Sequence, residues 1–238
     1  MLITSRDNPR VKHILKLQAA KRRKERSEYL VYGKTLCEQA LAAQVVSNLI
    51  FADEEQYERS DFPDKLLVSD RIIHGFTENA HVDMCAVCRM ESRNFLPERH
   101  VVVLDGIQDP GNLGAILRSA KAFGISNIFL SENCVDLYNI KVLRAAHGAH
   151  FLLGIQSGNL DEYLRLSDNR LVTTFVDEAS DFSQDPEKVY DIVFGNEGSG
   201  IRESIKPLSR ENLKIDIEFE SLNVAIAASI ILYTHFRN

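Results

Sequence analysis

The chain has 238 residues, of which 45% are hydrophobic and 26% charged, and it carries a net charge of -6. This length suits one large or two modest domains, and the composition is that of an ordinary globular protein, which excludes extended disorder and fibrous repeats. The longest mostly apolar stretch, from Val224 to Tyr233, is far shorter than the roughly 20 residues that a membrane helix needs.

The first thirty residues are basic, although the chain as a whole is acidic. They contain nine lysines and arginines against three acidic residues, a local charge of +6 that leaves -12 for the rest. Such asymmetry favours contact with phosphate groups, but a solvated helix face has the same composition, so both interpretations stay open. The opening residues, Met1 to Arg6, lack the apolar core of a signal peptide, which predicts a cytoplasmic protein with reduced cysteines.

Short helices and strands are predicted to alternate in the first third of the chain. Apolar residues recur at helical spacing from Asp7 to Gln18, where Asp7 or Asn8 can cap a basic helix. Strands are then predicted at residues 29–32, 48–51, 65–68 and 84–90, and helices at residues 34–43 and 71–76. This alternation is typical of a small α/β unit.

A linker is predicted from Glu91 to Arg99, because this stretch has only two apolar residues and includes Pro97. We therefore expect two domains, at residues 1–95 and 100–238. In the second domain, continuous apolar runs typical of strands covered on both faces recur at residues 101–104, 127–130, 171–176 and 191–194. With helical stretches between them, these runs predict a mainly parallel α/β sheet.

A turn rich in glycine and proline follows Leu104 and leads into a helix that continues to Ala120. In an open α/β sheet, ligands bind beyond the carboxyl ends of the strands, where such turns gather. Asn112 is a candidate cap for this helix. Arg118 lies about two turns further on, among small and apolar neighbours, so its charge needs a carboxylate or phosphate partner unless it is simply exposed in a surface salt bridge.

A second turn, Gly195 to Ile201, is rich in glycine and again follows a predicted strand. Its three glycines let the backbone fold tightly and approach a ligand closely. The glycine order GxxGxG, with no GK[ST] after it, is neither that of a phosphate loop nor that of a dinucleotide fingerprint. A tight turn without a ligand is the alternative interpretation.

A third segment, from Leu213 to Tyr233, combines a predicted strand with an apolar helix. Alternate residues from Leu213 to Phe219 are predicted to point inward, and Ser221 is well placed to cap the helix. Asn223 stands in an apolar context, where a buried amide needs hydrogen-bond partners. The helix is apolar on most sides, which predicts burial in a core or between two subunits.

Together these segments resemble the SpoU family of ribose 2'-O-methyltransferases, within the SPOUT superfamily. Four stretches are similar to the three motifs of that family and to a segment between them: residues 109–120, 194–201, 221–225 and 141–149. The resemblance is strong over about residues 100–238. More loosely, residues 3–9 and 29–33 resemble the substrate-binding domain of the ribosomal-protein L30 type.

The resemblance implies a deep trefoil knot at the carboxyl end, an obligate homodimer, S-adenosylmethionine as methyl donor and ribosomal or transfer RNA as acceptor. It also implies that the three segments converge on one pocket and that the reaction needs no metal. The cofactor contacts carried over from the family are Gly195, Leu213, Ile215 and Leu222, and the catalytic cluster is Asn112, Arg118, Glu197, Ser221 and Asn223.

Arg118 matches the position of the family's proposed proton acceptor. Because a guanidinium has a pKa above about 12, we expect Arg118 instead to grip an RNA phosphate and to stabilise the developing alkoxide. Glu197 is expected to orient Arg118 or the ribose, while Ser221 and Asn223 fix the nucleotide.

The chain departs from the family beside the adenine pocket. Leu213-Lys214-Ile215 and Ile217 stand where many members have Ile-Pro-Met followed two residues later by glycine. This departure motivates an alternative function, an RNA-binding dimer that keeps the methyltransferase fold but is weakened in catalysis. A nucleotide-binding α/β enzyme of unknotted topology is a third hypothesis, motivated by the glycine turns.

Two other residue pairs have metal-like spacing. Cys85 and Cys88 have no second such pair with them, and we expect both to be buried in the strand at residues 84–90. His147 and His150 have a glycine between them and no acidic or cysteine partner nearby in the sequence. No metal site is therefore expected.

Overall fold

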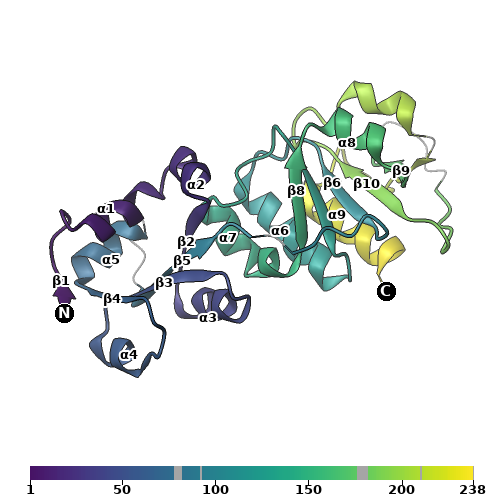
Figure 1. The fold of residues 1–238 in the computed structure, drawn as a ribbon. Coiled ribbons are helices and arrows are strands. Elements are labelled where there is room, and N and C mark those ends of the chain that lie inside the picture. Colours follow the sequence, from purple (N-terminus) through teal and green to yellow (C-terminus); the bar gives the residue numbers. More distant parts are fainter. Residues whose placement is uncertain (78–81, 92, 176–181, 210, 238) are drawn as a thin grey trace. The chain divides into compact units, whose positions relative to one another are not determined.

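The computed structural model describes residues 1–77, 82–91, 93–175, 182–209 and 211–237. The chain divides into two compact units, Met1–Glu91 and Ser92–Asn238 (Figure 1). Each unit has its own sheet and its own hydrophobic core. Helices and strands alternate in both units, as the sequence predicted.

The first unit is built on a five-stranded sheet in the order β1-β4-β3-β5-β2. Strands β1, β4 and β3 run parallel, whereas β5 pairs antiparallel with β3 and with β2. The strands are β1 (Leu2–Ile3), β2 (Glu28–Tyr32), β3 (Val46–Phe51), β4 (Lys65–Val68) and β5 (Met84–Arg89). The helices are α1 (Pro9–Lys16), α2 (Ala20–Arg26), α3 (Lys34–Ala42), α4 (Glu54–Arg59) and α5 (Asp70–Phe76).

The predicted strands and helices of this unit are confirmed, but three further elements were missed. Helix α1 is capped by Asn8, whose side chain accepts a hydrogen bond from the backbone N–H of Arg10. Strand β1 is too short to show an alternation of apolar and polar residues, and α4 has no buried residue and hence no apolar face. In α2 only Arg23 is buried, so this helix has no apolar stripe that a sequence pattern could reveal.

Arg23 has a structural role that its basic neighbours do not share. It is 7% exposed, and its Nη1 donates to the carbonyl oxygens of Leu17 at 2.9 Å and Gln18 at 2.7 Å. These carbonyls lie just beyond the end of α1. The guanidinium therefore joins α2 to the end of the preceding helix, and this charged group stabilises the fold.

The second unit contains a six-stranded sheet in the order β11-β9-β10-β6-β7-β8. Every strand pair in the described part of this sheet is parallel, which confirms the predicted parallel α/β architecture. The strands are β6 (Val101–Leu104), β7 (Asn127–Ser131), β8 (Gly154–Gly158), β9 (Arg170–Thr173), β10 (Tyr190–Phe194) and β11 (Glu211–Asn212).

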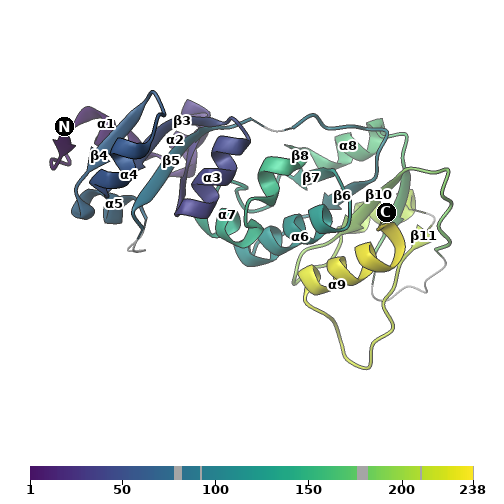
Figure 2. The ribbon, with the colours of Figure 1, turned by 90° about the horizontal axis from the view of Figure 1, so that it is seen from below.

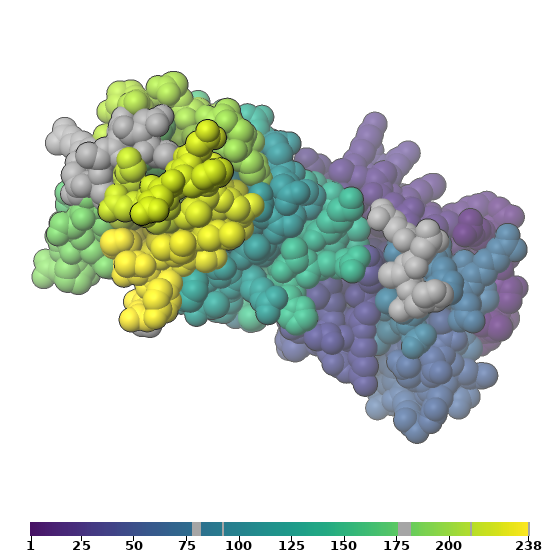
Figure 3. Space-filling model, turned by 180° about the vertical axis from the view of Figure 1, so that it is seen from behind, coloured from purple at the N-terminus to yellow at the C-terminus, as the bar shows by residue number. Residues whose placement is uncertain are grey.

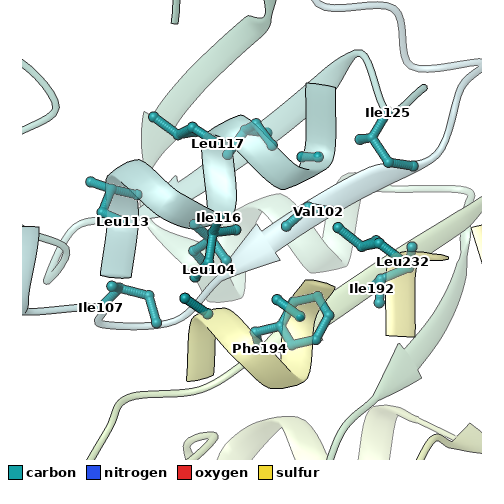
Figure 4. Packing of buried hydrophobic residues seen from close by; sticks show 14 of the residues in the cluster. Val102, Leu104, Ile107, Leu113, Ile116, Leu117, Ile125, Ile192, Phe194 and Leu232 are labelled. Atoms are coloured by element: carbon teal, nitrogen blue, oxygen red, sulfur yellow. The ribbon is translucent and has the colours of Figure 1, made fainter. Parts of the chain in front are cut away.

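Helices cover both faces of this sheet, which explains the continuous apolar runs of its central strands. On one face α6 (Pro110–Ala122), α7 (Ile140–Ala146) and α9 (Val224–Ile231) pack on residues such as Val102 and Ile192 (Figure 4). On the other face α8 (Leu160–Leu166) and the short 3-10 helix Glu203–Leu208 pack on Val103 and Val193. Figure 2 shows α6 and α9 side by side. Further short turns are a 3-10 helix at Ala149–Leu152 and a π-helical turn at Leu232–Phe236.

The strand predicted to alternate from Leu213 to Phe219 was wrong. The last strand, β11, ends at Asn212, and Phe219 is 78% exposed. Leu213 is buried, and it donates its backbone N–H to Thr173, but the chain then leaves the sheet. Strand β8 was missed because its sequence has one large apolar residue between two glycines. Val176, the predicted end of β9, lies outside the described residues.

Most of the predicted linker packs on the second unit. The backbone of Leu96 exchanges hydrogen bonds with the buried side chain of Asn127, at 3.0 Å and 2.6 Å, and Phe95 packs against the core. A Cβ added to Gly154 would lie 2.6 Å from the carbonyl oxygen of Asn94, so glycine is needed where the chain crosses the first residue of β8. The predicted linker is therefore attached to the second unit, although none of residues 93–99 is fully buried.

Cys85 and Cys88 are fully buried in β5, as predicted. Burial raises the pKa of both thiols far above the usual value, so they stay protonated and behave as small apolar groups.

Candidate functional site

The turn after β6 ends at the cap of α6. The carboxylate of Asp109 accepts a hydrogen bond from the backbone N–H of Asn112 at 2.8 Å, and Pro110 occupies the first helical position. The cap is therefore Asp109, and the prediction that Asn112 caps this helix was wrong. The difference has a chemical consequence, because a helical Asn112 has its side-chain amide available for other contacts.

The glycine turn, residues 195–201, follows β10 and folds back on itself. Asn196 and Gly200 exchange two backbone hydrogen bonds, at 2.9 Å and 3.0 Å. A Cβ added to Gly195 would lie 2.2 Å from the backbone of Gly200 and Ile201, so only glycine fits there. The side-chain oxygen of Asn196 accepts from the N–H groups of Gly198 and Ser199, which closes the turn.

Glu197 joins the glycine turn to the start of α6. Its carboxylate accepts hydrogen bonds from the backbone N–H groups of Gln108 and Asp109, at 3.2 Å and 3.1 Å, and from Nδ2 of Asn112 at 3.0 Å. Partial burial would raise the pKa of Glu197, but the donors from Asn112 and from this backbone outweigh it and lower the pKa below its usual value. Nδ2 of Asn196 is a fourth donor, at 3.4 Å. The group is therefore an anion held by four donors, which suits positioning better than proton transfer.

Asn112 continues this chain of contacts to α9. Its Oδ1 accepts a hydrogen bond from Nδ2 of Asn223 at 2.9 Å, while its own Nδ2 donates to Glu197. Asn223 is the cap of α9, because its Oδ1 accepts from the backbone N–H groups of Ala225 and Ile226. The prediction that Ser221 caps this helix was wrong. The three predicted segments do converge, because side-chain hydrogen bonds join Glu197 to Asn112 and Asn112 to Asn223.

A pocket of about 650 Å³ lies beside this chain of contacts. Its walls come from the end of β10, the glycine turn, the segment that follows β11, and the start of α9. It is lined by all four residues predicted to contact a cofactor, Gly195, Leu213, Ile215 and Leu222, and also by Glu197, Ser221 and Asn223. This volume falls in the range of small-molecule sites, and the position beyond the carboxyl ends of parallel strands is the usual one.

A smaller pocket of about 280 Å³ lies at the other ends of the strands. It is lined by residues 98–100, 124–126 and 186–189, which precede β6, β7 and β10. Ligands of open α/β sheets bind at the carboxyl ends of the strands, so the larger pocket is the candidate site.

Asn112 and Arg118 are not among the described residues that line the larger pocket. Arg118 is exposed, and the described part of the chain offers it no ion-pair or hydrogen-bond partner. Its neighbour Ser119 bonds to Ser229 of α9 at 2.7 Å between hydroxyl oxygens, so the helix that presents Arg118 is fixed to α9. Within one chain, the guanidinium therefore lies apart from the pocket.

Sequence reasoning missed four polar residues that build this site. Gln108 and Asp109 donate their backbone N–H groups to Glu197. Arg202, which follows the glycine turn, donates from its side chain to Asp105, which follows β6. Asp105 directly follows the apolar run of β6, and this buried acid at a strand end is the signal that could have found it.

Two negative findings concern the described residues alone. No helix among them is long and apolar enough to cross a membrane. Within the same ranges, no group of three His, Cys, Asp or Glu side chains could hold a metal ion.

The fold and the site define an α/β enzyme with a small-molecule pocket at the carboxyl ends of its parallel strands. The model of the SpoU rRNA Methylase family matches residues 99–233, and that of the MRM3-like substrate binding domain matches residues 8–86. The chain belongs to the SpoU rRNA methylase family.

One relative and one solved structure match over almost the whole chain, and a second relative matches over about half of it. The 23S rRNA (guanosine(2553)-2'-O)-methyltransferase RlmP of Bacillus subtilis (strain 168) is 31% identical over 245 residues, which cover 99% of this chain and 98% of RlmP. The human mitochondrial rRNA methyltransferase 3 is 34% identical over 152 residues, which cover 56% of this chain and 36% of that protein. A crystal structure of an rRNA methyltransferase from Sinorhizobium meliloti with bound AdoMet is 26% identical, with a TM-score of 0.86 and coverage of 98% of this chain and 96% of that one.

Proposed function

We propose that this protein transfers the methyl group of S-adenosylmethionine to a ribose 2'-hydroxyl of RNA, and that the RNA is ribosomal. The observation that supports this most is the contact chain Glu197, Asn112 and Asn223, which joins the three family motifs beside one pocket. The named activities of RlmP and of the Sinorhizobium meliloti protein support the substrate class.

The pocket residues fit the proposed cofactor. The bare backbone at Gly195 forms one wall, and Leu213, Ile215 and Leu222 supply apolar surface for a planar base. When bound, S-adenosylmethionine supplies a methyl carbon already activated by its sulfonium. The chain then has to position the ribose and remove a proton from its hydroxyl.

The polar residues of the site divide these tasks. Glu197 is a positioning residue, because its carboxylate is occupied by four donors. It fixes Asn112, and Asn223 and Ser221 hold the nucleotide at the mouth of the pocket. Arg118, whose exposed guanidinium has no partner among the described residues, grips the RNA phosphate and stabilises the developing alkoxide.

A homodimer would complete the site. Helix α9 exposes Ile226 and Ile230, by 54% and 39%, and the π-helical turn that continues it exposes Tyr233, by 50%. In Figure 3 the yellow carboxyl-terminal part lies on the surface. Isolated apolar residues are common on surfaces, but a stripe of this kind along a helix favours an interface. Because α6 is fixed to α9, a copy bound there would bring its Arg118 toward the pocket of its partner. This arrangement accounts for an Arg118 that does not line its own pocket.

The first unit, Met1–Glu91, is the RNA substrate-binding domain in this proposal, and it ends four residues before the predicted boundary at residue 95. Between residues 16 and 26, four exposed cations have no ion pair or hydrogen bond in the ranges that the structure describes: Lys16, Lys21, Lys24 and Arg26. Such free cations on one short stretch suit the phosphates of RNA. The four cysteines are free thiols, which supports a reducing, cytoplasmic location.

Calorimetry with S-adenosylmethionine and transfer of a labelled methyl group to ribosomal RNA test the function. We expect saturable binding, and a methylated ribose when the product RNA is mapped. Absence of binding at millimolar cofactor would leave the alternative, an RNA-binding dimer, which the charged Lys214 and the bulky Ile217 in the pocket wall favour. RNA binding without transfer would identify that alternative.

A further inference from the structure

The end of the glycine turn is held by a contact that none of the three motifs contains. Arg202 follows the turn directly, and its backbone N–H donates to Oδ2 of Asp105 at 3.0 Å. Its side chain donates to Oδ1 of the same carboxylate, from Nε at 2.9 Å and from Nη2 at 2.6 Å. One carboxylate thus binds both the backbone and the guanidinium of one arginine.

The position of Asp105 makes this contact rigid. Asp105 is 5% exposed and stands at the carboxyl end of β6, where its own backbone N–H donates to the carbonyl of Phe194 at 2.9 Å. Phe194 is the last residue of β10, directly before the glycine turn. Asp105 therefore holds the chain where it enters the turn, through its backbone, and where it leaves the turn, through its side chain.

Two further carboxylates hold the guanidinium in place. Nη1 of Arg202 lies 3.4 Å from Glu132, which follows β7, and 3.6 Å from Asp161 in α8. Only 23% of the Arg202 side chain is exposed. Charge-assisted bonds of this kind are stronger and more directional than neutral ones, especially when a guanidinium binds with two nitrogens.

The turn that this contact holds is one wall of the pocket. Gly195 and Ile201, the first and last residues of the turn, both line the pocket, and their backbones are already in close contact. A movement of Arg202 would shift Ile201 and open the turn. A ligand would then have to order the turn as it binds, and this cost would reduce its affinity for the pocket.

We propose that Asp105 and Arg202 are a positioning pair that keeps the glycine turn in the shape that accepts the methyl donor. This inference rests on the proposed function, since it assigns the pocket to S-adenosylmethionine. The pair touches neither the donor nor the RNA in this assignment. It acts through the backbone of the turn.

The test uses Asp105→Asn, Arg202→Gln and Arg202→Lys in the full-length protein. We expect each variant to bind S-adenosylmethionine about 10- to 100-fold more weakly by calorimetry, with Arg202→Lys at the mild end because it keeps the charge. The KM for the donor should rise, while the KM for RNA stays within twofold of the wild-type value. Glu132→Gln, which removes an outer contact, should have a smaller effect than Asp105→Asn.

Asp191→Asn is a matched control for a purely structural effect. Asp191 is also a buried acid with three side-chain donors, from Tyr163, Ser167 and Asn169, but it stands at the start of β10, away from the turn. We expect this variant to lower the melting temperature and to keep the wild-type affinity for the donor. Equal losses of donor affinity in Asp105→Asn and Asp191→Asn would overturn the inference, as would wild-type affinity in all three variants of the pair.

Hydrogen exchange without any ligand separates this inference from the proposed function. In Asp105→Asn and Arg202→Gln the amides of residues 196–202 should exchange at least tenfold faster than in the wild type, while those of β6 and β7 stay protected. Unchanged exchange in the turn would contradict the positioning pair. A wild-type protein that binds no donor would instead refute the proposed function, whatever the exchange data show.

Discussion

The side-chain amides of Asn112 and Asn223 meet at 2.9 Å, where Nδ2 of Asn223 donates to Oδ1 of Asn112. Asn223 uses its other side-chain atom, Oδ1, to cap α9, and Asn112 uses its Nδ2 to bind Glu197. Asn223 thus uses one side-chain atom for the fold and one for Asn112, whereas both side-chain atoms of Asn112 bind residues of the site. The two functions of Asn223 can be separated by substitution.

Asn223→Ala should weaken both donor binding and methyl transfer, and it should lower stability by about 1 kcal/mol because α9 loses its cap. Asn223→Asp keeps an acceptor for the cap but loses the donor to Asn112. We expect this second variant to melt near the wild-type temperature and still to lose activity. If Asn223→Asp were fully active, the contact with Asn112 would have no part in the reaction.

Arg118→Ala should reduce the rate of methyl transfer by about 100-fold or more, because the developing alkoxide loses its cation. Calorimetry should find nearly unchanged affinity for S-adenosylmethionine, since Arg118 does not line the pocket of its own chain. Arg118→Lys, which keeps the charge, should retain part of the activity. Full activity in the alanine variant would contradict the assignment.

A mixing experiment addresses the proposed dimer. Gly195→Ala should distort the glycine turn that walls the pocket of its own chain and so prevent donor binding there, because the added Cβ would clash with the backbone of Gly200. Dimers that combine one Arg118→Ala chain with one Gly195→Ala chain would have one complete site if the arginine acts in the partner. Recovered activity on mixing is the expected result, and no recovery would place Arg118 at its own pocket.

Lys21, Lys24 and Arg26 are expected to bind RNA phosphates. Changing all three to glutamine should reduce the slope of log affinity against log salt by about 2 to 3, as measured by filter binding over a salt series. Arg22 pairs with Glu25, so Arg22→Gln should change the slope less. An unchanged slope in the triple variant would mean that this stretch is a solvated helix face.

Arg23, in the same basic stretch, is not expected to bind RNA phosphates. It is buried against the carbonyls of Leu17 and Gln18, so Arg23→Gln should lower the melting temperature of the first unit and leave the salt dependence unchanged.

Stability should fall in mild acid because of His150. Burial lowers the pKa of this imidazole to about 3, whereas the unfolded chain has a value near 6.5. As the pH falls, the unfolded state therefore binds a proton on His150 before the folded state does. The contribution of His150 to the free energy of unfolding is complete above pH 6.5 and is lost as the pH falls toward 3. Between pH 7 and pH 5 we expect a loss of about 2 kcal/mol from this group in urea unfolding.

His150→Gln is the variant that checks this assignment. It should lower stability at pH 7 and flatten the pH dependence between pH 7 and pH 5. His100 and His235, whose pKa values burial also lowers, remain in that variant and account for any residual slope. A pH dependence equal to that of the wild type would exclude His150 as its source.

The sheets could be predicted from the sequence because both faces of their central strands are covered. Val101 to Leu104 is an apolar run of strand length, and Lys65 to Val68 is apolar except for Lys65; the structure has strands with these bounds. Helix caps were harder, since Asp109 and Asn112 can both cap. Pro110 at the first helical position indicates Asp109, and this local signal was available.

Contacts between distant parts of the chain could not be predicted in the same way. Asp105 and Arg202 stand 97 positions apart, and they meet only because β10 pairs with β6. No hydrophobic period or motif in the sequence predicts that β10 lies next to β6 in the sheet. The trefoil knot likewise stays a prediction.

The close crossing of Asn94 over Gly154 bears on how this protein can be recombined with its relatives. Residues 93–99 belong to the second unit through Leu96 and Asn127, so a graft that begins at residue 100 would strip backbone partners from a fully buried asparagine. Chimaeras that exchange the amino-terminal half should be joined at Glu91, where the two units divide. The first unit could then be replaced without rebuilding the unit that contains the pocket.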